Sequence, residues 1–232
     1  MKKIIIYTLA AGFFALIGCR DDSLNPVPTF EPAVHAYSIF DGFDAAAQAK
    51  KSDIAANAKT FAATAQDAAK LDCKIRWVSL DNKLTVSKID VYVDMIESYN
   101  DPDGNPKTVS LGNGGVLLKS ITPAAANRQW NVYSVTPLEI YNLFKDATVK
   151  YDKVNAVKVF ANPDRPRTTG KWLQPAGKVK TLNVSADSFV ITWRLTTSDG
   201  LVFKTWEPGS ICADPTLFTE ASANCSLITS VK

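Results

Sequence analysis

Three carboxylates that lie close together, Asp90, Asp94 and Glu97, are the first candidates for catalysis. A glycosidase needs two carboxyl groups that flank the bond it cleaves, about 5 to 10 Å apart. Asp90 and Asp94 instead occupy alternate positions in a run where polar and apolar residues alternate, which places both on one face of a strand. Such a pair is typical of a solvated sheet face. Without convergent partners these residues indicate no enzyme.

Histidine and metal chemistry have little support. His35 is the sole histidine, so any Ser-His-Asp or Cys-His site would have to use it. We expect a structural or exposed residue there. No cluster of histidines and cysteines suggests zinc, and we expect no cofactor. The oxygen-rich turn Asp101–Asn105 lacks EF-hand spacing and the closing glutamate, so a simple turn is favoured over a calcium site, which stays open.

A basic, proline-containing loop, Asn162–Trp172, is the leading candidate for ligand binding. An aromatic ring on a loop can stack on a sugar, and neighbouring cations can orient the ligand. We therefore predict contacts from Trp172, with Arg165, Arg167 and Lys171 beside it. The alternative is that the Trp172 ring folds back onto the core, because large aromatic side chains are highly buried on average.

The cysteines divide into two groups. Cys212 and Cys225 flank a short loop and, in an oxidising compartment, are expected to form a disulfide. Closing that loop would stabilise the fold by roughly 3 kcal/mol. Cys73 lies in a strand-like run and is predicted to be buried and unpaired.

Residues 1–18 have the three parts of a secretory signal. Lys2 and Lys3 are basic, and Ile4–Ala15 is apolar but shorter than the roughly 20 residues that span a bilayer. Leu16-Ile17-Gly18-Cys19 resembles the lipobox of bacterial lipoproteins. The resemblance implies cleavage before Cys19 and lipid attachment to its sulfur. Several acyl chains would hold the protein on its membrane.

Arg20-Asp21-Asp22 resembles the export signal of surface-displayed lipoproteins in certain Gram-negative bacteria. It implies an outer-membrane protein that faces the cell exterior; the alternative is a solvated tether. Residues 19–33, with several prolines, are expected to be that tether, and residues 34–232 the folded part, as one domain or two subdomains. Without Lys2 and Lys3 the chain has 24 basic and 23 acidic residues and no basic cluster, so we expect no nucleic-acid partner.

The body of the chain alternates short apolar–polar runs with turns, as antiparallel strands do. Ser198-Asp199-Gly200 predicts a hairpin. Strands are predicted near these ranges: Cys73–Trp77, Ile89–Met95, Val116–Leu118, Gln129–Ser134, Val154–Phe160, Phe189–Leu195, Leu201–Trp206 and Ser226–Val231.

Two segments suggest helix. Thr136-Pro137-Leu138-Glu139 has the pattern of a capping box, and Leu138, Tyr141 and Phe144 or Lys145 follow at helical spacing, so we predict a helix over about 137–146. The alanine-rich segment Asp44–Leu71 favours helix in its first half. Its second half, with Lys59–Thr64, fits a helix or a strand. The predicted fold is mainly β, an immunoglobulin-like antiparallel β-sandwich with one short capped helix.

The lipid cysteine with its acidic flank, the strand that runs into Asp101–Gly104, the Phe189–Trp206 hairpin and the Cys212/Cys225 end together resemble accessory lipoproteins of starch-utilisation-type nutrient uptake systems. The resemblance implies a non-catalytic binding accessory, for a glycan or another nutrient, beside an outer-membrane transporter. The alternative is a structural or adhesive surface protein that contacts other proteins.

Overall fold

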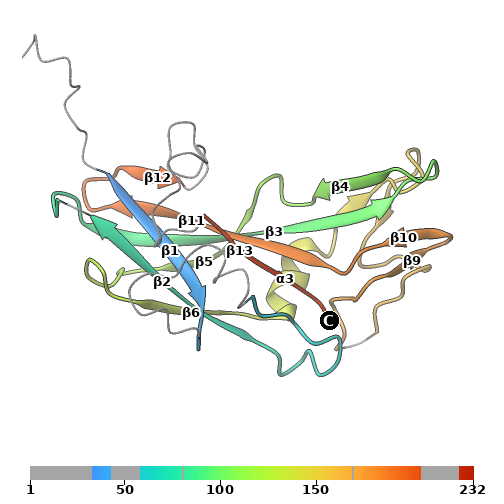
Figure 1. The fold of residues 1–232 in the computed structure, drawn as a ribbon, viewed down its shortest axis with the longest axis horizontal. Helices are drawn as coiled ribbons and strands as arrows, with labels where there is room; N and C mark the ends of the chain where they lie inside the picture. Colours follow the sequence, from blue (N-terminus) through green and yellow to red (C-terminus); the bar gives the residue numbers. More distant parts are fainter. Residues whose placement is uncertain (1–32, 43–57, 80, 169, 205–224) are drawn as a thin grey trace, which may run out of the picture. The chain divides into compact units, whose positions relative to one another are not determined.

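The computed structural model describes residues 33–42, 58–79, 81–168, 170–204 and 225–232. Within these ranges the chain is mainly β, with antiparallel sheets and one short helix (Figure 1). Residues Pro32–Lys232 form one compact unit. The prediction of a mainly β chain is therefore confirmed.

A three-stranded sheet has the order β1-β2-β6 and is antiparallel throughout. Its strands are β1 (Val34–Phe40), β2 (Leu71–Ser79) and β6 (Asn131–Val135). Every second residue of β2 is buried, which is the alternation that predicted this strand. β1 was not predicted, because residues on both of its faces are buried and its sequence has no clear period of two.

The larger sheet is built on two long strands, β3 (Val86–Asn100) and β11 (Ser188–Thr197), which pair antiparallel (Figure 1). β3 also pairs with β4 and β5 on its other edge, and with β10 near its end. β11 pairs with β12 and β13. The shorter strands are β4 (Pro106–Ser110), β5 (Val116–Ile121), β9 (Gly177–Val179), β10 (Leu182–Val184), β12 (Val202–Lys204) and β13 (Leu227–Ser230).

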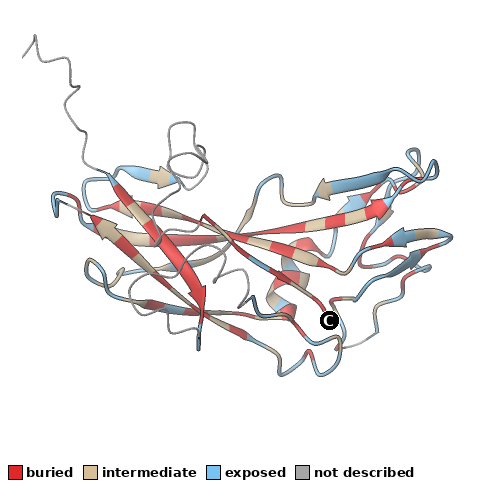
Figure 2. Cartoon of the chain, viewed as in Figure 1, coloured by how far each residue is buried: buried red, intermediate tan, exposed pale blue. Residues whose placement is uncertain are grey.

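One hydrophobic cluster includes buried residues of the three-stranded sheet and of the larger sheet, and Figure 2 shows buried segments on the strands of each. On β3 and β11 the fully buried positions alternate with half-buried ones, as their sequences predicted, although Asp90 and Asp94 are also buried. Burying one such large apolar side chain contributes about 1.5–3 kcal/mol. The cluster contains Ile75 and Trp77 from the smaller sheet and Val93 and Trp193 from the larger one.

The predicted helix is confirmed as α3 (Pro137–Phe144). The capping box forms: the Glu139 backbone N–H donates to Thr136 Oγ1 at 3.2 Å, and the Thr136 N–H donates to Glu139 Oε2 at 2.9 Å. The buried face differs in part from the predicted one: Phe144 was predicted, but Ile140 was not. Ile140 and Phe144 are buried, whereas Leu138 is 43% exposed.

The predicted hairpin between β11 and β12 is also confirmed. The Gly200 N–H donates to the Thr197 carbonyl, and Thr197 N–H donates to the Leu201 carbonyl at 2.9 Å. Gly200 has φ +90°, a conformation that favours glycine.

Other strand predictions changed in length or position. The strand predicted over Val154–Phe160 is reduced to β8 (Val157–Lys158), which pairs with β7 (Thr148–Val149). β4, β9 and β10 were not predicted. These strands are short and largely exposed, so burial leaves little pattern in their sequences.

The first half of the alanine-rich segment lies outside the described residues. From residue 58 onward the segment is irregular rather than helical. Phe61, which is 1% exposed, forms a parallel bridge with Val231, so the extended alternative holds at this residue. The cause is tertiary: a buried aromatic ring anchors a stretch whose alanines favour helix.

Candidate functional site

The loop of residues 162–174, described except at residue 169, contains the predicted ligand-binding residues. An ion-pair network lies beneath it. Arg167 Nη1 and Nη2 donate to the two carboxylate oxygens of Asp187 at 2.5 and 3.1 Å, and Arg165 Nη1 donates to the same group at 3.3 Å. The side chains of Arg165, Arg167 and Asp187 are only 4%, 3% and 0% exposed.

This burial corrects the roles predicted for Arg165 and Arg167. Both guanidinium groups are directed into the domain, where they pair with Asp187 and bond to backbone carbonyls, including those of Pro175 and Ser185. Neither is presented to a ligand. Lys171 is exposed and keeps its place on the solvent side of the loop. The sequence of a basic loop is the same whether its cationic side chains point into the domain or towards solvent, so it cannot predict their direction.

The backbone around Trp172 is fixed at three successive residues. Arg167 donates to the Trp172 carbonyl at 2.6 Å. The buried Gln66 side chain accepts from Leu173 N–H at 2.8 Å and donates to the Leu173 carbonyl at 2.7 Å. The Gln174 N–H donates to Asp187 at 2.8 Å. A loop held in this way loses little conformational entropy when a ligand binds.

Gly170 makes the turn into this segment possible. It has φ +76°, and a Cβ added there would lie 2.6 Å from Asp67 Oδ2. Any side chain would therefore be strained and would displace Asp67.

Trp172 lies beside Tyr141 of α3. Their ring centroids are 6.3 Å apart with an interplanar angle of 34°, and both residues are half-buried. Tyr141 also makes an edge contact with Phe160, at 5.3 Å between centroids. Within the described ranges, neither the Trp172 indole N–H nor the Tyr141 hydroxyl has a hydrogen-bond partner. The two rings thus combine partly exposed apolar surface with two free polar groups.

The sequence pattern pointed to Trp172 but not to Tyr141, Gln66 and Asp187, which support it. Tyr141 could have been considered, because it lies on the predicted helix. Gln66 and Asp187 are single polar residues far from Trp172 in the sequence, and only the fold brings them to the loop.

A buried carboxyl, Glu97, extends the network on the core face of β3. Tyr151 donates to Glu97 Oε1 at 2.6 Å, and Arg165 Nη1 lies 3.5 Å from the same atom. Burial raises the pKa of Glu97 above its usual value of 4.5, despite the Tyr151 hydrogen bond and the nearby arginines. Glu97 is therefore not on the face that carries Asp90 and Asp94.

Asp90 and Asp94 hold neighbouring strands together. Asp90 accepts from Ser120 of β5 and pairs with Lys88 at 2.7 Å. Asp94 accepts from Ser110 of β4 and from the Gly112 N–H at 2.8 Å. Burial would raise the pKa of Asp90, but the hydrogen bonds from Lys88 and Ser120 outweigh it and lower that pKa. The expected solvated face is thus a bonded one, since the two residues are 8% and 6% exposed.

Trp130, another half-buried loop aromatic, has cations against its ring. Arg76 and Lys74 of β2 lie 5.0 and 5.4 Å from its centroid, and the Tyr37 ring makes an edge contact at 5.2 Å. Trp77 and Trp193 are buried, as predicted. Trp206 lies outside the described residues.

The Asp101–Asn105 turn is held by its own residues. Asp101 Oδ1 accepts from the backbone N–H groups of Asp103 and Asn105, and the Lys153 ammonium bridges the carboxylates of Asp101 and Asp103. A lysine thus supplies the positive charge there. The described part of the chain has no cluster of three or more His, Cys, Asp or Glu residues suited to a metal.

Cys73 is buried and free, as predicted, and burial raises its pKa to about 12. Cys225 is buried, but Cys212 lies outside the described residues, so their disulfide stays a prediction. Cys19 also lies outside them. His35 is half-buried on β1.

No protein-family model matches the chain, and a search of curated proteins found no match. Among the described helical residues, none forms a helix long and apolar enough to cross a membrane.

Proposed function

We propose that the protein is a lipoprotein, anchored to the outer membrane through Cys19 and displayed on the cell exterior. It acts there as a non-catalytic accessory that binds a glycan for a nutrient uptake complex. Its fold is an immunoglobulin-like β-sandwich, a proposal that the three-stranded and eight-stranded antiparallel sheets, which share one hydrophobic cluster, support. The binding surface comprises Trp172, Tyr141 and Lys171.

The observation that carries this proposal is the aromatic pair on a fixed loop. Two half-buried rings, Trp172 and Tyr141, come from different elements and keep their polar groups free of partners within the described ranges. Their apolar surfaces suit the C–H faces of a sugar, and their N–H and O–H groups suit its hydroxyls. Loops on a rigid β scaffold are where binding residues concentrate.

A glycan array tests the binding function. The full chain, purified in detergent, should retain particular glycans, and the Trp172→Ala variant should lose them. Retention of no glycan by the wild type, together with capture of intact proteins from the cell surface, would instead favour the structural or adhesive alternative.

Anchoring has its own test. Labelled palmitate should enter the wild-type chain and not Cys19→Ala. Protease added to intact cells should degrade the displayed protein; protection in intact cells but not in lysed ones would contradict surface display.

A further inference from the structure

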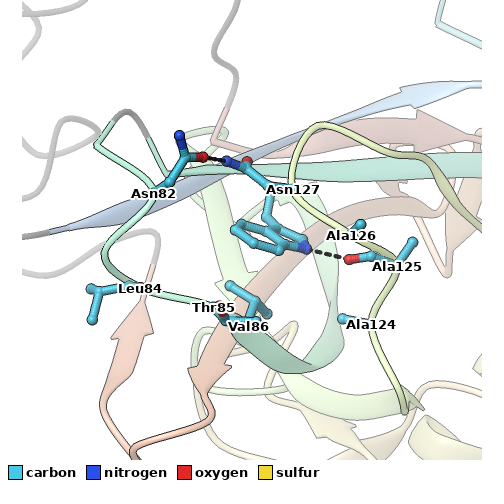
Figure 3. A pocket seen from close by; sticks show the side chains of 9 residues that line it. Asn82, Leu84, Thr85, Val86, Ala124, Ala125, Ala126 and Asn127 are labelled. Atoms are coloured by element: carbon cyan, nitrogen blue, oxygen red, sulfur yellow. Dashed lines mark hydrogen bonds between the residues drawn. The ribbon is translucent and has the colours of Figure 1, made fainter.

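A pocket of about 250 Å³ lies between the segments of residues 82–86 and 124–127, and Trp77 of β2 lines it as well (Figure 3). The aromatic ring of this pocket belongs to the core. Trp77 is 2% exposed, and its indole N–H donates to the Ala125 carbonyl at 2.7 Å, as Figure 3 shows. Trp172 differs in both respects, because it is half-buried and its N–H makes no hydrogen bond within the described ranges. A ligand therefore finds an accessible aromatic ring at the Trp172 loop and not in this pocket.

A carboxylate to which the sequence did not point, that of Asp67, lies beside the Trp172 loop. The buried Gln66 side chain bonds to both backbone groups of Leu173, which fixes the neighbouring Asp67 next to the loop. A Cβ added at Gly170 would lie 2.6 Å from Asp67 Oδ2 and 3.2 and 3.3 Å from Cγ and Oδ1. The Asp67 carboxylate therefore occupies the space that a side chain at residue 170 would fill.

The Asp67 carboxylate is exposed and, among the described residues, makes no hydrogen bond or ion pair. Gln66 and its partner Leu173 are each 1% exposed, so they point into the domain, whereas Trp172 is half-buried. Trp172 follows Gly170 by two residues, which is at most about 7 Å of chain. The carboxylate, with about four positions that accept hydrogen bonds, thus lies within about one sugar ring of Trp172.

The charges around Trp172 are balanced. Arg165 and Arg167, two of the three cations of the loop, pair inside the domain with Asp187. Lys171 remains exposed, and Asp67 beside it carries the opposite charge. An anionic glycan would be attracted by Lys171 but repelled by Asp67, whereas a neutral glycan can donate hydroxyl protons to Asp67. Hydrogen bonds to an ionised acceptor are roughly twice as strong as those between neutral groups.

We infer that Asp67 is a ligand contact that selects neutral glycans with adjacent free hydroxyl groups at the Trp172 surface. Two neighbouring hydroxyls of a sugar ring stacked on Trp172 donate to the two oxygens of the carboxylate. Gly170 is then part of the site, because its lack of a side chain leaves room for the carboxylate. This inference rests on the proposed function and adds to it a residue and a class of ligand.

The test uses the full chain in detergent and an array of neutral polysaccharides (β-glucan, xyloglucan and mannan) and anionic ones (polygalacturonate, alginate and chondroitin sulfate). We expect the chain to retain neutral members. The affinity for the tightest of them, measured by isothermal titration calorimetry, should fall at least about tenfold in Asp67→Ala, as expected when hydrogen bonds to a charged group are lost.

Asp164→Ala is the matched control. Asp164 is an exposed carboxylate of the same loop whose side chain has no partner among the described residues, and its removal changes the net charge equally. This variant should bind the glycan as the wild type does. Equal losses of affinity in Asp67→Ala and Asp164→Ala would mean a general effect of charge and would overturn the inference.

Gly170→Ala tests the position of the carboxylate without removing it. The new Cβ would displace Asp67, so the affinity should fall. Adding Gly170→Ala to Asp67→Ala should cause little further loss, because both changes act on the same contact. Additive losses would show that Gly170→Ala acts through the loop backbone and would contradict the place of Gly170 in the site.

Trp172→Ala, measured in parallel, separates this inference from the proposed function. Full affinity in Asp67→Ala with loss in Trp172→Ala would leave glycan binding at Trp172 and overturn the role of Asp67. Retention of anionic glycans alone would contradict the ligand class and leave the proposed function standing. Retention of no glycan would contradict the proposed function and, with it, this inference.

Discussion

Trp130 and Trp172 are both half-buried tryptophans on loops, and both have cations nearby. The difference is that the cations contact the ring of Trp130 but the backbone of Trp172. At Trp130, Arg76 and Lys74 lie against the ring. At Trp172, Arg167 bonds to the carbonyl and, with Arg165, to Asp187, and the ring has only aromatic contacts among the described interactions. A cation on the ring competes with a ligand for that surface. A cation on the backbone fixes the residue and leaves its ring accessible.

The largest effect in this comparison should come from removing the anion beneath the Trp172 loop. Asp187→Ala leaves the buried Arg167 guanidinium without a carboxylate, leaves Glu97 as the remaining anion beside Arg165, and frees the Gln174 N–H. Breaking a buried ion pair in this way costs about 3–5 kcal/mol. Urea unfolding of wild type and variant measures the loss. Asp146→Asn is the control, because its pair with Lys158 is exposed and its removal should change little. Equal losses of unfolding free energy in the two variants would show that the buried network does not stabilise the fold.

A smaller stability loss is expected on the Trp130 side. Trp130→Ala removes two cation–π contacts and an edge contact with Tyr37. Together these contribute about 2 kcal/mol. Thermal unfolding should show this loss, while binding of any glycan found on the array should be unchanged. Weaker glycan binding with unchanged stability would mean that Trp130, too, is a ligand contact.

The charge state of Glu97 gives a pH signature of the buried network. Because its folded pKa is raised, its stabilising contribution is fully present below its unfolded pKa, near 4.5, and is lost as pH rises through the folded pKa. Glu97→Gln should therefore lose less stability than wild type as the pH rises above about 4.5. Urea unfolding of both proteins at a series of pH values measures this difference in the free energy of unfolding.

Glu139 is the matched control of opposite sign. Burial alone would raise its pKa, but bonds from Lys119 and Thr136 lower it, so its contribution is present above the unfolded pKa and is lost in acid. Glu139→Gln should destabilise at neutral pH and have little effect in acid. The same sign of pH dependence for both variants would contradict the account of Glu97.

Much of this molecule could be predicted from local pattern. The alternation of apolar and polar residues predicted β2, β3 and β11. The Asp-Gly turn predicted the β11–β12 hairpin, and the capping box predicted α3. Each depends on residues close together in the sequence. The prediction failed at β1, whose faces are both buried, and at Phe61, which a partner near the end of the chain holds extended.

The candidate site divides in the same way. Trp172 was identified because an aromatic residue in a basic, proline-containing loop has a local signature. Arg165 and Arg167 were misassigned because their partner, Asp187, is distant in sequence and carries no pattern of its own. The direction in which a charged side chain points depends on where its counter-charge lies in the fold.

Parallel binding measurements on Trp172→Ala and Trp130→Ala test the central claim most directly. The ligand is the tightest glycan from the array, and affinity and melting temperature are recorded for both variants and wild type. Trp172→Ala should weaken binding by at least about 1 kcal/mol, roughly fivefold, and leave the melting temperature nearly unchanged. Trp130→Ala should lower the melting temperature and leave glycan affinity unchanged. A Trp172→Ala variant that binds as wild type does but is destabilised by several kcal/mol, as an emptied core position would be, would show that Trp172 serves packing and contradict the account.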